Sequence, residues 1–145
     1  MKTLTAIILT LLLLTTNATA EPRKKILIVA SNMIDMGDPE KHDARNNLWE
    51  FAPPYHIFVS HGFDVDFVSP QGGKVDFMMD PLGISSYTIK YEGFLEKTNS
   101  SLSPAQTDPN DYWGVFIGGG YGVMFDVAEN KEIHSIISRV YESGG

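Results

Sequence analysis

The chain has 145 residues, contains no cysteine, and carries 11 basic against 18 acidic side chains, which gives a formal net charge of −7. The absence of cysteine excludes disulfides, thiolate metal sites and a cysteine nucleophile within these residues. The acidic balance, without a basic cluster, argues against nucleic-acid binding, because phosphate contacts depend mainly on lysine and arginine. The length suits one domain, and no repeat or low-complexity tract divides it.

The first twenty residues have the pattern of a secretory signal peptide. Lys2 supplies a positive start, Leu4 to Leu14 form an apolar core, and Ala18-Thr19-Ala20 fits a small-residue cleavage site. Because this apolar stretch is too short to span a bilayer and no later segment is longer, we expect a periplasmic or secreted protein without a membrane anchor. Residues 21–145 are then the folded domain, and loss of Lys2 takes the charge from −7 to −8. The alternatives are a buried N-terminal helix and an uncleaved anchor.

Strand and helix patterns alternate in the first half of the domain. Residues 24–31 form a continuous apolar run, which is typical of a central parallel strand covered on both faces. Residues 44–61 carry apolar side chains at helical spacing, so we expect a helix that Pro53 and Pro54 kink or delay. Residues 63–70 alternate apolar and acidic side chains and predict a second strand, nearer an edge of the sheet.

The second half is less regular at first. Residues 71–84 predict an irregular excursion or a small hairpin, and residues 87–102 a poorly defined helix. A capped helical turn is expected at 103–106 and a short buried strand at 114–117. The apolar stripe of residues 130–143 predicts a final helix. This order of elements is that of the front portion of an α/β domain.

A glycine-rich loop, Gly118-Gly119-Gly120-Tyr121-Gly122, directly follows the strand predicted at 114–117. In an open α/β sheet, ligands collect at the carboxyl ends of the strands. The loop does not match a dinucleotide fingerprint, because Val123 and Phe125 stand where a third glycine belongs, and it lacks the Gly-Lys-Ser/Thr ending of a Walker loop. Two interpretations remain equally open: a backbone N–H cradle for an oxyanion or carboxylate, and a tight turn without a ligand.

Glu50 is the candidate catalytic acid or base. It lies off the apolar stripe, near the start of a helix that faces the carboxyl ends of the strands. Taken alone, Glu50 is better explained as a surface residue that complements the helix dipole. His42 is the only histidine expected near a site, and no histidine pair has metal-motif spacing, so no metal is expected. The chain also lacks the Gly-x-Ser-x-Gly elbow of a serine hydrolase.

Four stretches, in this order, resemble the ThiJ/PfpI superfamily of the class I glutamine amidotransferase-like fold, and most of all its branch of chaperone-like glyoxalases and protein deglycases. They are residues 25–29, residues 48–55, residues 65–73 with Asp80-Pro81 beyond, and residues 111–126. The resemblance covers essentially the whole chain after the predicted signal peptide. It implies an α/β fold with a flavodoxin-like, doubly wound parallel sheet, incomplete at the C-terminal end.

The resemblance also implies roles for particular residues. Glu50 matches the glutamate that hydrogen-bonds the family's nucleophilic cysteine, and Gly119 and Gly120 match the loop whose N–H helps to form the oxyanion hole. Tyr121 is a further candidate substrate-binding residue, where this branch usually has histidine, and Asn46-Asn47 replaces the usual Thr-Gly. The family's cysteine and its histidine partner follow the final Gly-Gly. The resemblance therefore implies that this chain is the N-terminal part of a longer parent and is inactive by itself.

For that parent, the resemblance implies cysteine-dependent chemistry on a small 2-oxoaldehyde such as methylglyoxal, or on glycated protein, with no cofactor. Because members of the superfamily commonly dimerise, a homodimer is also expected. Two alternatives stay open. One is a non-catalytic module that binds small molecules or acts as a chaperone, which the missing cysteine favours for the chain as given. The other is an amidase or peptidase of the same superfamily that uses the same residues.

Overall fold

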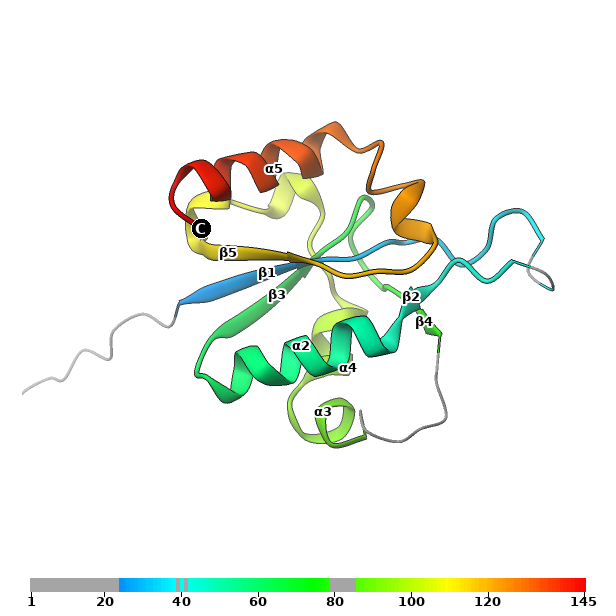
Figure 1. Ribbon diagram of the computed structural model, residues 1–145, viewed down its shortest axis with the longest axis horizontal. Coiled ribbons are helices and arrows are strands. Elements are labelled where there is room, and N and C mark those ends of the chain that lie inside the picture. Colours follow the sequence, from blue (N-terminus) through cyan, green and yellow to red (C-terminus); the bar gives the residue numbers. More distant parts are fainter. Residues whose placement is uncertain (1–23, 39, 41, 79–85) are drawn as a thin grey trace, which may run out of the picture.

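A three-stranded parallel sheet, ordered β3-β1-β5, lies at the centre of the computed structural model, which describes residues 24–38, 40, 42–78 and 86–145 (Figure 1). The strands are β1 (Lys25–Val29), β3 (Asp64–Val68) and β5 (Tyr112–Ile117). β1 pairs in parallel with both neighbours. The central position predicted for the first strand and the outer position predicted for the second are therefore confirmed. The predicted signal peptide lies outside the described residues.

Helices cover both faces of this sheet, as the doubly wound fold predicted from the sequence requires (Figure 1). The helices α2 (Leu48–Ser60), α3 (Ser86–Tyr91) and α4 (Phe94–Asn99) lie on one face, and α5 (Lys131–Glu142) lies on the other. Within the described residues, no helix is long and apolar enough to cross a membrane.

The continuous apolar run of β1 has a direct structural reason. Ile26 and Ile28 belong to the core under α2 and α4, whereas Leu27 and Val29 belong to the core under α5. All four side chains are buried. A central strand with a helix layer on each face has no solvent-facing side, so it shows no alternation of apolar and polar residues.

The helix predicted to begin at residue 44 begins instead at Leu48, four residues later. Asn46–Asn47 form a short strand, β2, which pairs in parallel with β4 (Phe77–Met78). Asn47 caps the helix, since its side chain accepts a hydrogen bond from the backbone N–H of Trp49. From there α2 continues as one helix through both prolines and ends at Ser60.

The less regular segment agrees with its prediction only in part. In the described part of residues 71–84, β4 pairs in parallel with β2, so it is not half of a hairpin. The poorly defined helix predicted at 87–102 is two short helices, α3 and α4, separated by Gly93 in the left-handed conformation at φ 75°. Short 3₁₀ turns complete the chain: η1 (Pro104–Gln106), as predicted, η2 (Pro109–Asp111) and η3 (Gly122–Met124).

Candidate functional site

A pocket of about 470 Å³ lies between the start of α2 and the loop that follows β5. Three residues that the sequence selected line this pocket, Glu50, Gly120 and Tyr121. The fourth, Gly119, lies directly beneath the Glu50 carboxylate. The other lining residues are Asn47, Met78 and Met124. The four selected residues, one at position 50 and three at positions 119–121, thus lie together in the fold.

The Glu50 carboxylate occupies the space that a side chain at position 119 would need. A Cβ atom placed on Gly119 would overlap both carboxylate oxygens. Glu50 is the third residue of α2 and lies close to the positive end of the helix dipole. It is exposed, and it has no hydrogen-bond or ion-pair partner in the part of the chain that the structure describes. A carboxylate in this state is available to accept a proton from a ligand in the pocket.

Close packing fixes the glycine loop under the helix start. A Cβ atom on Gly118 would overlap the ring of Phe51, and one on Gly120 would lie 3.0 Å from the carbonyl oxygen of Arg45. Gly120 also has φ +134°, which non-glycine residues rarely adopt. The backbone N–H of Asn47 donates to the carbonyl oxygen of Gly119 at 3.2 Å. Glycines are therefore needed here, because the Phe51 ring and the backbone before α2 lie too close to the loop for a larger residue.

The backbone N–H groups of Gly119 and Gly120 donate to no acceptor among the described residues. Both stand at the carboxyl end of β5, next to the Glu50 carboxylate. Unpaired N–H groups in such a loop can bind an oxyanion that develops on a ligand. The arrangement therefore combines a base with hydrogen-bond donors, which is what proton transfer next to a carbonyl group requires.

Asn46 joins the start of α2 to the rest of the fold, a role that its departure from the family pattern did not predict. Its side chain is fully buried. The carboxamide oxygen accepts from the N–H of Ser31 at 2.9 Å, and the amide donates to the carbonyl oxygens of Ser31 and Asp76, each at 2.9 Å. This one side chain thus connects the end of β1, β2 and the segment before β4, which fixes the position from which α2 presents Glu50.

A second connection ties the end of the glycine loop to the loop after β1. One carboxylate oxygen of Asp126 accepts from the backbone N–H of Asn32 at 2.8 Å. The Asn32 side chain in turn accepts from the N–H of Gln71 at 2.8 Å and donates to the carbonyl oxygen of Gly72 at 3.2 Å. Three loops at the carboxyl end of the sheet are therefore held in one arrangement. Asp126 belongs to the motif that the sequence analysis quoted, but no role was assigned to it.

Arg45, which is close in sequence to the helix start, does not neutralise Glu50. Its guanidinium group binds the Asp43 carboxylate, with contacts of 2.9 Å and 2.6 Å. The hydrogen bond from Arg45 lowers the pKa of Asp43 against the smaller opposing effect of its burial. The two charges offset each other, so no described cation compensates the charge of the Glu50 carboxylate in the pocket.

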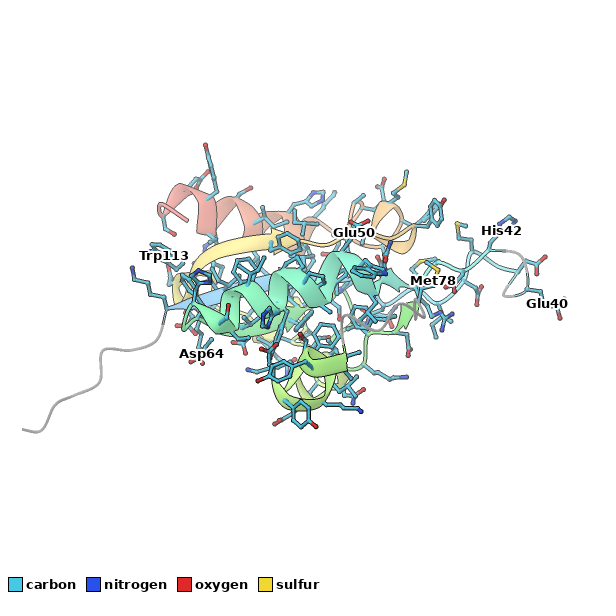
Figure 2. All side chains as sticks on the ribbon, turned by 60° about the horizontal axis from the view of Figure 1, so that its bottom comes forward. Glu40, His42, Glu50, Asp64, Met78 and Trp113 are labelled. Atoms are coloured by element: carbon cyan, nitrogen blue, oxygen red, sulfur yellow. The ribbon has the colours of Figure 1, made fainter. Side chains whose placement is uncertain are left out.

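His42 does not lie at the site, in contrast to the prediction. Figure 2 shows it at the far end of the loop between β1 and β2, well apart from Glu50. Its backbone forms a turn with Met36 and Asp38. The sequence placed His42 after a strand end but could not show that the loop extends away from the sheet. Within the described ranges, no three histidine, aspartate or glutamate side chains gather in a group that could hold a metal ion.

Met78 and Met124 were missed by the sequence analysis. Met78 ends β4 and Met124 ends η3, and each lines the pocket beside Glu50. Neither belongs to a catalytic motif, and methionine is a common core residue, so no sequence signal marks them as pocket residues. Only the pairing of β4 with β2 brings Met78 next to the helix start.

Comparisons with known proteins show which sequences and folds this chain resembles. No family model matches the chain. The glutathione-independent glyoxalase hsp3102 of Schizosaccharomyces pombe is 25% identical over 132 residues, which cover 84% of this chain and 54% of that protein. The glutathione-independent glyoxalase HSP31 of Saccharomyces cerevisiae is 25% identical over 130 residues, with the same coverage of 84% and 54%. The chain thus spans about half the length of these curated relatives.

The fold agrees with a solved structure as well. The crystal structure of glyoxalase III from Candida albicans superposes with a TM-score of 0.72 at 20% identity, covering 84% of this chain and 54% of that one. The ordered motifs, the doubly wound sheet and these matches point to one group of proteins. The chain is a relative of the glutathione-independent glyoxalases and has the fold of the ThiJ/PfpI superfamily.

Proposed function

We propose that these residues form the carboxylate and oxyanion half of a cofactor-free glyoxalase site, which converts a 2-oxoaldehyde to a 2-hydroxy acid. The observation that carries the proposal is the close approach of the Glu50 carboxylate to Gly119, beside a pocket lined by Gly120, where the two glycine N–H groups have no acceptor among the described residues. The thiol nucleophile would come from sequence beyond these 145 residues, which contain no cysteine. The relatives' names supply the substrate class, and the geometry supports the division of roles.

In the proposed reaction, a thiolate adds to the aldehyde carbon, which forms a C–S bond and an alkoxide held by the Gly119 and Gly120 N–H groups. Glu50 then removes the proton from that carbon, and the electron pair moves toward the neighbouring carbonyl group. Return of that proton to the neighbouring carbon, with uptake of a second proton from water by the oxygen on it, leaves a thioester next to a hydroxyl group. Water hydrolyses the thioester, which breaks the C–S bond and frees the thiol. One carbon is oxidised while its neighbour is reduced, so no external redox partner is needed.

The test is glutathione-free consumption of methylglyoxal by the full-length protein, with the 2-hydroxy acid measured as product. Glu50→Gln keeps the shape of the side chain but removes the base, so we expect kcat/KM to fall by roughly 100-fold or more. Glu132→Gln is the matched control, because Glu132 also lies in the exposed first turn of a helix, α5, but on the other face of the sheet. We expect this control to retain full activity.

Two results would contradict the proposal. If the full-length protein consumes no 2-oxoaldehyde, the enzyme assignment is wrong. A non-catalytic binding module is then favoured, provided that the protein still binds the aldehyde. If turnover occurs but Glu50→Gln leaves it unchanged, Glu50 is not the base. Hydrolysis of an amide substrate in place of aldehyde conversion would favour the amidase or peptidase alternative.

We also propose that the protein is exported. The support is the sequence of residues 1–20, with its positive start, apolar core and Ala18-Thr19-Ala20 ending. The N-terminal sequence of the mature protein is expected to begin at Glu21, in the periplasmic or secreted fraction. A mature protein that keeps Lys2, or one that stays entirely in the cytoplasmic fraction, would refute export.

A further inference from the structure

The pocket beside Glu50 is lined by two chemically different kinds of group. Glu50, Asn47 and the backbone of Gly120 provide polar groups, whereas Met78, Met124 and the Tyr121 ring provide apolar surface. The two methionines come from separate elements, β4 and η3. Figure 2 shows Met78 on the same end of the molecule as Glu50, away from Trp113 and Asp64. A ligand whose reacting end meets Glu50 would therefore place its other end on the apolar surface.

The apolar surface is accessible to a ligand. Met124 is 68% exposed and Tyr121 is 61% exposed, although both side chains are large and apolar in character. Covering such surface with an apolar substituent is favourable, because it removes hydrocarbon from water on both sides of the contact. Methionine side chains also adapt to the shape of what they contact, since they are unbranched and polarisable.

The size of the pocket also favours a ligand larger than methylglyoxal. A volume of about 470 Å³ falls within the range of pockets that bind drug-sized ligands. Methylglyoxal, whose only substituent is a methyl group, is too small to fill a pocket of this volume. The uncompensated charge of Glu50 makes the pocket unfavourable for a substituent that carries a second negative charge.

We propose that this site selects uncharged 2-oxoaldehydes with an aromatic or branched apolar substituent, which Met78 and Met124 contact. The proposal rests on the glyoxalase function proposed above and specifies its substrate class. Each buried methylene group is worth roughly fourfold in affinity, so an aryl group in place of methyl gives on the order of tenfold or more in kcat/KM.

The test compares phenylglyoxal with methylglyoxal in the full-length protein. We expect kcat/KM to be at least about tenfold higher for phenylglyoxal. Met124→Ser and Met78→Ser should each lower the phenylglyoxal to methylglyoxal ratio by about fivefold or more, mainly through a higher KM for phenylglyoxal. Met36→Ser is the matched control, because Met36 is exposed in the loop before β2 and does not line the pocket, and it should leave the ratio unchanged.

Turnover of both aldehydes with a ratio that Met124→Ser and Met78→Ser do not change would overturn this inference and leave the glyoxalase function standing. A second measurement does not depend on turnover. Titration with phenylpropanedione should shift the methyl NMR signals of Met78 and Met124, but not that of Met36, more than titration with diacetyl does. Equal shifts from the two diketones would overturn the inference. If turnover were absent and these selective shifts were still seen, the ligand class would stand and the glyoxalase function would fail.

Discussion

The Asp66 carboxylate, toward the amino ends of the strands, is paired with several groups, whereas the Glu50 carboxylate, in the pocket at the carboxyl ends, has no partner among the described residues. The Asp66 carboxylate binds Lys97 at 2.8 Å, Lys25 at 3.4 Å and the Tyr112 hydroxyl at 3.2 Å. Glu50 has no such partner among the described residues. A polar group contributes to folding only when it is satisfied within the fold, so the first region serves stability, and the second keeps its groups available to a ligand.

The exposed groups of the pocket are held by tightly packed residues beneath them, here called the support: the glycine loop 118–122 and Asn46. The glycine loop lies against backbone on one side and against Glu50 and Phe51 on the other. Asn46 joins the segments beneath it. A functional carboxylate must be held within a fraction of an ångström, and rigid neighbours supply that precision. Mutations in the support and in the pocket should therefore affect different quantities, stability in one case and activity in the other.

Gly122→Ala should produce the largest loss of stability. Gly122 is buried, and a Cβ atom there would lie 2.5 Å from the carbonyl oxygen of Ala44 and 2.5 Å from the Ser31 hydroxyl oxygen. Neither neighbour is the end of a long flexible side chain, so the loop itself must move. We expect the free energy of unfolding, measured in urea, to fall by about 3 kcal/mol. Gly114→Ala is the control, since its Cβ would meet only the tip of Ile26 at 3.3 Å. Equal losses in both variants would contradict tight packing at the loop.

Asn46→Ala should have the next largest effect. The change removes three hydrogen bonds and leaves the N–H and the carbonyl oxygen of Ser31 without their partner, whereas the Asp76 carbonyl keeps the bond from the backbone N–H of residue 46. Buried groups left unsatisfied are expensive, so we expect a loss of about 2 kcal/mol in the free energy of unfolding. Asn110→Ala, which removes an exposed bond to Asp108, is the control and should cost about 0.5 kcal/mol or less. A loss no larger than that of the control would show that Asn46 does not hold the start of α2.

Asp66→Asn should give a smaller loss that depends on pH. Burial opposes ionisation of Asp66, but the hydrogen bond and charge of Lys97 and the charge of Lys25 outweigh it and lower the pKa. The ionised carboxylate therefore stabilises the fold above its unfolded-state pKa of about 3.9, and this stability is lost as the pH falls through the lower folded-state pKa. Solvent screening limits the expected loss at pH 7 to about 1 kcal/mol.

The measurement for Asp66 is the difference in unfolding free energy between the wild type and Asp66→Asn at several pH values. That difference should be largest at neutral pH and shrink below about pH 4. The exposed Glu129→Gln serves as the control for a general change in net charge. If the difference does not vary with pH, the ion pairs of Asp66 do not stabilise the fold.

Local patterns in the sequence predicted most of the fold, because the elements that carry it have regular periodicity. The run of β1 and the stripe of α5 are properties of neighbouring residues, and both were placed correctly. The start of α2 was misplaced because its boundary depends on contacts between distant segments. Asn46 bonds to residues 15 and 30 positions away, and no local pattern contains that information.

The residues of the site likewise fall into those that a local motif predicted and those that only distant contacts bring to the pocket. Glu50, Gly119, Gly120 and Tyr121 were chosen through motifs, and the structure places them together. Met78 could not be chosen, because it reaches the pocket only through the pairing of two two-residue strands. The position of His42 was wrong for a related reason, since a strand end predicts where a loop starts but not its direction.

Glu50→Gln should have the smallest effect on stability, although it removes a charge at the centre of the proposed site. The carboxylate is exposed and has no partner in the described part of the chain, so little folding energy depends on it. The uncharged amide loses only the favourable interaction with the helix dipole, so we expect a change of about 0.5 kcal/mol or less in urea unfolding. Activity is expected to fall steeply in the same variant. Loss of activity without loss of stability would show that Glu50 acts in the chemistry and not in folding. A loss of both activity and stability would instead assign Glu50 to the support, together with Gly122 and Asn46.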